Sequence, residues 1–178
     1  MNAVSLDTSA TDFLKLFNEQ GYVLLPPIFS EDYLNKMRSI MLELIEEEKQ
    51  MLQVPDYNDD GFLLCAPYYA DKYPEILAVL QNEKYLSFVE AVLEKWFILY
   101  LYSNNCVPPN YGKTKAVRIH VDTPRLIPNY NWGIGSLILL DDFTEENGGT
   151  WLLPASQNQE QQPTEEFFYQ NAERLVAP

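Results

Sequence analysis

The hydrophobic pattern of this chain changes its period near Phe97. Before that residue, apolar side chains recur every three to four positions, as they do on the buried face of an amphipathic helix. After it they alternate with polar side chains, as they do on a half-buried strand. Helical segments followed by strand segments are typical of an α+β domain with an antiparallel β core. We therefore expect a single domain over residues 1–178, mainly helical over 1–96 and a β core over 97–178.

Local start and stop signals place the helices. An apolar face runs through residues 8–21 and ends at Gly21, a residue favoured just after a helix. Ser30, followed by Glu31 and Asp32, has the features of a helix N-terminus and predicts a long helix. Further helices are expected near 74–80, 83–95 and 164–172. The segments expected as strands are 22–25, 97–103, 116–122, 133–143, 150–154 and 174–178.

The charge balance excludes some classes of partner. The chain has 26 acidic and 12 basic residues, for a net charge of -14, which repels phosphate backbones and anionic membranes. Plain solubility explains the acidity equally well. Cys65 and Cys106 match no metal or redox spacing, and neither a signal peptide nor a membrane-spanning run is visible. We expect a cytoplasmic protein that binds neither nucleic acid nor membrane.

The single histidine of the chain lies two residues before a carboxylate. On a strand, Arg118, His120 and Asp122 would share one face, and the apolar residues between them would share the other. His120 and Asp122 would then be about 6.6 Å apart along the strand, close enough for both side chains to reach one ion. Imidazole and carboxylate are two of the three ligands of the 2-His-1-carboxylate iron(II) site.

A plainer interpretation stays open. An amphipathic strand with Arg118, His120 and Asp122 turned to solvent has the same pattern, and it would suit a structural or interaction protein. The iron(II) triad also needs two histidines, and this chain has one.

Three blocks of sequence resemble one enzyme family, in the same order and with similar spacing. They are "FNEQGYVLLPPIFSEDYLNKMRSI", "SNNCVPP" with "RIHVDTPR", and "LILLDDFTEENGGTWLLPASQ", within residues 13–157. The blocks are similar to those of the phytanoyl-CoA dioxygenase-like family of non-haem iron(II), 2-oxoglutarate-dependent oxygenases. The resemblance implies a double-stranded β-helix (jelly roll, cupin-like) core with N-terminal helices packed on it.

The resemblance also implies chemistry. His120 and Asp122 would be catalytic metal ligands, with Fe(II), 2-oxoglutarate and O2 as cofactors and co-substrates and a small molecule as substrate. Related halogenases have a small residue in place of the carboxylate, so Asp122 implies a hydroxylase. Asn105 and Arg118 would contact 2-oxoglutarate, and Arg125 and Trp132 would contact substrate. Pairing of the arginines with nearby acids and ordinary packing of Trp132 are the alternatives.

The chain departs from the family in two places. The family's "PGSH" is "PASQ" here, with Ala155 and Gln157, but that histidine is generally not a metal ligand. The family's distal histidine and the arginine that binds 2-oxoglutarate are not found. A jelly roll also needs eight strands, about two more than the segments above supply. We therefore expect a β core that lacks its last strands, in an incomplete record of a longer enzyme. The alternatives are a natural degenerate fragment or a non-catalytic jelly-roll binding protein.

Overall fold

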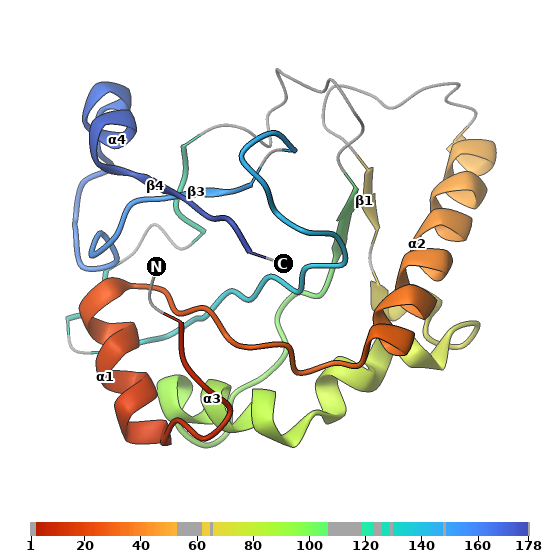
Figure 1. The fold of residues 1–178 in the computed structure, drawn as a ribbon, viewed down its shortest axis with the longest axis horizontal. Helices are drawn as coiled ribbons and strands as arrows, with labels where there is room; N and C mark the ends of the chain where they lie inside the picture. The colour runs from red at the N-terminus through yellow and green to blue at the C-terminus, as the bar shows by residue number, and fades with distance from the viewer. Residues whose placement is uncertain are drawn as a thin grey trace. The chain divides into compact units, whose positions relative to one another are not determined.

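A computed structural model describes residues 3–52, 62–64, 66–106, 119–122, 126–128, 130–147 and 149–177 (Figure 1). The chain divides into two units. The first contains Met1–Ile28, Glu83–Phe97 and Ile119–Pro178. The second contains Phe29–Asn82 and Ile98–Arg118.

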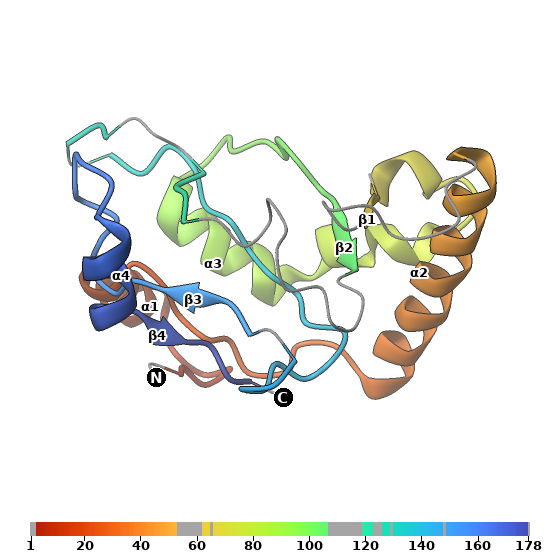
Figure 2. The same cartoon turned by 90° about the horizontal axis from the view of Figure 1, so that it is seen from above.

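The first unit combines helices with a small sheet. Its elements are α1 (Ala10–Gln20), α3 (Glu83–Leu93), β3 (Trp151–Leu152), α4 (Glu165–Asn171) and β4 (Glu173–Arg174). β3 and β4 pair antiparallel, with Trp151 opposite Arg174, and lie side by side next to α4 (Figures 1 and 2). The Arg174 guanidinium lies 5.5 Å from the centre of the Trp151 ring, so a cation–π contact reinforces this pair.

Helix α1 ends at the residue that its sequence predicts and begins at Ala10, two residues into the predicted segment. The Ser9 hydroxyl accepts a hydrogen bond from the Asp12 N–H at 3.1 Å, which caps the first turn. Gly21 ends the helix in the left-handed region, at φ 79°, where a side chain would be strained. The capping expected at Ser30 is confirmed too, because its Oγ accepts from the Tyr33 N–H at 3.2 Å.

Aromatic rings form the centre of the first unit. Phe13 of α1 and Phe88 of α3 are buried, and their ring centroids are 4.4 Å apart. Val92 completes this cluster from the next turn of α3. Residues from distant parts of the chain, including Val23 and Ile134, pack around it. The two helices are therefore held together mainly by apolar burial.

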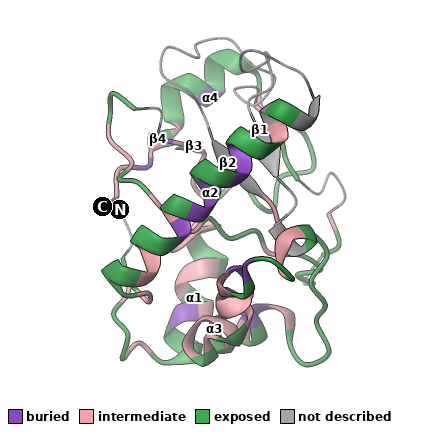
Figure 3. Ribbon diagram, turned by 90° about the vertical axis from the view of Figure 1, so that its right-hand side faces the viewer, coloured by how far each residue is buried: buried purple, intermediate pink, exposed green. Residues whose placement is uncertain are grey.

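The second unit is organised around one long helix. Its elements are α2 (Glu31–Leu52), β1 (Phe62–Leu64), η1 (Ala66–Tyr69), η2 (Pro74–Gln81) and β2 (Asn104–Cys106), of which η1 and η2 are 3-10 helices. Buried and exposed residues alternate along α2 at helical spacing (Figure 3). The buried residues of α2 are Met37, Ile40, Met41, Leu44 and Ile45.

Polar contacts attach the 3-10 helix η2 and the residues just before it to their neighbours in this unit. The Tyr33 hydroxyl donates to the Glu75 carbonyl at 3.1 Å, and the Tyr102 hydroxyl donates to the Ile76 carbonyl at 2.9 Å. Lys72 contacts the carboxylates of Glu43 and Glu47 on α2. These bonds fix η2, which buries Ile76, beside the helix.

Several strand predictions are wrong for the described residues. Segments 97–103, 119–122 and 133–143 have no strand pairing beyond one bridge, between Phe143 and Ala177. Segment 22–25 forms a single bridge, between Leu24 and Ala3. Residues 104–106, which lie outside the segments expected as strands, form β2 and pair antiparallel with β1. Alternating polarity shows only which side chains could share a face, whereas a strand also needs a partner backbone from elsewhere in the chain.

The described residues thus form helices and short two-stranded sheets. The jelly roll remains a prediction. Within the described part of the chain, no helix has the length and apolar character needed to cross a membrane.

Candidate functional site

His120 and Asp122 turn their side chains toward each other. His120 Nε2 lies 3.3 Å from Asp122 Oδ1. Two ligands at about 2.1 Å from one ion and at right angles to each other would have donor atoms about 3 Å apart. The observed separation therefore suits two neighbouring positions of an octahedral metal ion.

The pair is exposed. The His120 and Asp122 side chains are 53% and 81% exposed, and Val121 between them is 54% exposed. The reason is that residues 119–122 are not paired as a strand, so no sheet covers them. Among the described residues, no group of three metal-binding side chains is present.

Two distant segments define the surroundings of the pair. The Gln162 side-chain amide donates to the Ile119 carbonyl at 2.9 Å, next to the histidine. On the other side, Gly135 lies against Asp122, since a methyl group there would be 3.6 Å from Oδ2. Gln162 thus restrains the backbone from which His120 projects.

A second loop, Pro154–Gln157, closes the C-terminal end of α1. The Gln157 amide donates to the Asn18 carbonyl at 2.7 Å, and the Ala155 N–H donates to the Gln20 carbonyl at 2.8 Å. Any side chain at Gly21 would collide with the Gln157 amide. Gln157, which stands where the family has histidine, is therefore used here to complete a helix terminus.

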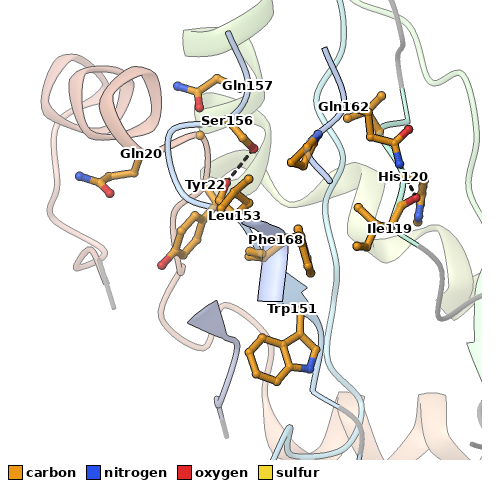
Figure 4. Close-up of a pocket in the computed structure, with 14 residues that line it drawn as sticks. Gln20, Tyr22, Ile119, His120, Trp151, Leu153, Ser156, Gln157, Gln162 and Phe168 are labelled. Carbon is orange, nitrogen blue, oxygen red and sulfur yellow. Dashed lines mark hydrogen bonds between the residues drawn. The ribbon is translucent and has the colours of Figure 1, made fainter. Parts of the chain in front are cut away.

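A cavity of about 190 Å³ lies within the first unit, with His120 on its wall (Figure 4). Trp151 and Phe168 supply aromatic rings, and Ser156 and Gln162 supply polar atoms. Tyr22 also lines it, with its hydroxyl donating to Glu173 Oε2 at 2.9 Å. Burial, together with the hydrogen bond to Glu173 and the charge of that carboxylate, raises the pKa of Tyr22, which keeps this hydroxyl protonated.

The other predicted site residues are distributed differently. Trp132 is exposed and does not line the cavity. Asn105 belongs to β2 in the second unit, and Arg118 and Arg125 lie outside the described residues. Sequence reasoning missed Tyr22, Trp151 and Gln162, because no local pattern indicates that they approach His120.

Comparison with known proteins gives one family. Residues 17–175 match the family model described as phytanoyl-CoA dioxygenase. Over 173 residues the chain is 26% identical to the uncharacterized protein Mb1539 of Mycobacterium bovis and to the uncharacterized protein Rv1501 of Mycobacterium tuberculosis. The match covers 95% of this chain and 63% of each relative. No solved structure matches significantly. Because the family model covers most of the sequence, the chain belongs to the phytanoyl-CoA dioxygenase family.

Proposed function

We propose that the chain carries two of the three metal ligands of an iron(II), 2-oxoglutarate-dependent oxygenase of the hydroxylase type. The observation that carries the proposal is the 3.3 Å separation of His120 Nε2 and Asp122 Oδ1. Imidazole nitrogen and carboxylate oxygen are donors that suit iron(II). Membership of the phytanoyl-CoA dioxygenase family, whose members generally use iron(II) and 2-oxoglutarate, supports the same assignment.

In such enzymes iron(II), 2-oxoglutarate and O2 together supply the oxidising chemistry that hydroxylates a carbon atom, with succinate and CO2 as co-products. The chain's own contribution is to hold and orient. His120 and Asp122 would hold the metal, and Gln162 restrains the backbone at Ile119, from which the imidazole of the next residue projects. The rings of Trp151 and Phe168 present an apolar wall to a substrate beside His120.

The proposal also assigns residues to the co-substrate and the substrate. Asn105 and Arg118 contact 2-oxoglutarate, and Arg125 and Trp132 contact the substrate, a small molecule. The fold is a jelly roll of the cupin-like kind that the family generally has. A facial triad takes a second histidine, so the third protein ligand is not one of this chain's histidines.

The single histidine makes the test unambiguous, because the imidazole signals in a proton NMR spectrum come from one residue. We expect that substoichiometric Fe(II), added without oxygen, selectively broadens the His120 signals. Asp122→Ala should need about tenfold more metal, because one of the two ligands is lost. Asp71→Ala, which removes an exposed carboxylate of the second unit, is the matched control.

Three outcomes separate the possibilities. Equal broadening in wild type and Asp122→Ala would remove Asp122 from the ligand set. No broadening at all would favour an ordinary exposed His–Asp contact. Metal binding without succinate formation in a chain extended to the length of the curated relatives would favour a non-catalytic binding protein.

A further inference from the structure

The cavity beside His120 has an unusual balance of hydrogen-bonding groups. Ser156 lines it with a hydroxyl that has already given its one hydrogen to the protein, because it donates to the Leu153 carbonyl at 2.7 Å. A hydroxyl that has donated its hydrogen can only accept further bonds. Tyr22 lines the cavity too, but its hydroxyl points away from it in Figure 4 and donates to Glu173 at 2.9 Å. Ser156 therefore favours a ligand that donates.

The amide of Gln162 has a similar orientation. Its nitrogen faces the Ile119 carbonyl, an atom that can only accept, so the assignment of nitrogen and oxygen is fixed by the contact. The amide oxygen remains available as another acceptor. Figure 4 shows Gln162 close to Ile119 and His120, on the other side of the cavity from Ser156.

The charges around the cavity favour an uncharged ligand. Apart from His120, the described residues that line the cavity include no ionisable side chain other than the protonated Tyr22. In the metal-free chain a carboxylate or phosphate entering it would lose water and would meet no lysine or arginine among the described lining residues, which is unfavourable. The net charge of -14 opposes an anion further.

The size and walls limit the apolar part of the ligand. The cavity measures about 190 Å³, and one of about 150 Å³ is enough for a benzene ring. Phe168 is buried in its wall, and Trp151, which is 41% exposed, adds a second aromatic side chain to the lining. There is room for one ring with a small polar substituent.

We infer that this cavity binds a small uncharged molecule consisting of an aromatic-sized ring and a hydrogen-bond donor such as an amide or a hydroxyl. As a statement about substrate class it rests on the proposed function, because His120 then places the metal next to this ligand. As a statement about binding it stands on the cavity alone.

The test uses the metal-free chain with its three tryptophans, and a Trp151→Phe variant identifies the part of the fluorescence change that comes from Trp151. The probes are benzamide, benzyl alcohol and benzoate, which share a ring and differ in charge and in donors. Benzamide and benzyl alcohol should change the Trp151 fluorescence saturably, and benzoate should bind about tenfold more weakly.

A matched pair of variants locates the binding. Ser156→Ala removes a lining acceptor and should weaken benzamide binding about fivefold. Ser87→Ala removes a hydroxyl that makes the same contact, to the Lys84 carbonyl at 2.7 Å, but lies on α3 away from the cavity. It should leave benzamide binding unchanged.

Each contrary result overturns the inference. Benzoate binding as tightly as benzamide would show that the cavity accepts an anion, and would overturn the preference for an uncharged ligand. Absence of saturable binding, or equal effects of the two serine variants, would remove the site. Because no metal is present, these results are independent of the broadening of the His120 signals on which the proposed function depends.

Discussion

The side-chain amide of Gln157 donates a hydrogen bond to the Asn18 carbonyl at 2.7 Å, joining residues 139 positions apart in the sequence. The last carbonyls of a helix have no partner within it. At the end of α1, three carbonyls receive hydrogen bonds from outside the helix. The Gly21 N–H donates to Phe17, the Gln157 side-chain amide donates to Asn18, and the Ala155 N–H donates to Gln20. The loop that contains the family's altered "PGSH" motif is therefore a structural support for α1.

Removing this amide should destabilise the first unit. Gln157→Ala leaves the Asn18 carbonyl without its protein partner, and we expect a loss of about 1 kcal/mol in the free energy of unfolding. Urea unfolding followed by circular dichroism measures it. Gln161→Ala, an exposed glutamine in the following loop, is the control and should have little effect. Equal stability of Gln157→Ala and wild type would show that water satisfies the carbonyl equally well.

Replacing Ala155 with glycine should stabilise the protein. Its φ of 56° lies in the left-handed region, where a Cβ is strained. The relief of strain is partly offset by the greater freedom of glycine in the unfolded chain. We expect Ala155→Gly to raise the free energy of unfolding by about 0.5–1 kcal/mol.

A second alanine provides the contrast for that measurement. Ala172, at φ -76°, is already in an ordinary conformation, so Ala172→Gly should lower stability. If both glycine variants were destabilised to the same extent, strain at Ala155 would be ruled out.

Local signals account for the helices but not for the site. Gly21 marks the end of α1 and Ser30 the start of α2 in the sequence itself, because capping depends on neighbouring residues. The contact of Gln162 with Ile119 spans 43 positions, and no periodicity indicates it. His120 and Asp122 could be singled out because their spacing is short. The strand expected around them could not be verified locally, since pairing depends on distant backbone.

Tyr22 should make the protein sensitive to alkali. Its pKa is raised above 10.0 in the folded state, first by burial and then by its hydrogen bond to Glu173 and the charge of that residue. Between the unfolded and the folded pKa, the unfolded state has lost the proton that the folded state keeps, so stability falls as pH rises. Below about pH 10 the contribution is fully present.

Tyr22→Phe should therefore reduce the loss of stability that occurs as the pH rises. The urea midpoint of the variant should fall less than that of wild type between about pH 9 and about pH 11. Tyr85→Phe, whose hydroxyl contacts Ser136 instead of a carboxylate, is the control. A decline that is equally steep in Tyr22→Phe would assign the alkaline sensitivity to other tyrosines, such as Tyr33, whose pKa is also raised by burial.

The apolar run at residues 98–101 of the second unit should limit the solubility of the chain. These residues belong to segment 97–103, which was expected as a strand but has no strand pairing, and Ile98 and Tyr100 are each at least 80% exposed. Contiguous exposed apolar surface is a common cause of aggregation, whereas single exposed apolar residues are ordinary. Ile98→Lys with Tyr100→Lys should therefore raise the concentration at which light scattering increases. The control is Tyr68→Lys, which adds the same kind of charge outside that run, at a tyrosine that is 85% exposed. If Tyr68→Lys raised that concentration as much per added lysine, the effect would come from net charge, and the apolar run would have no special role.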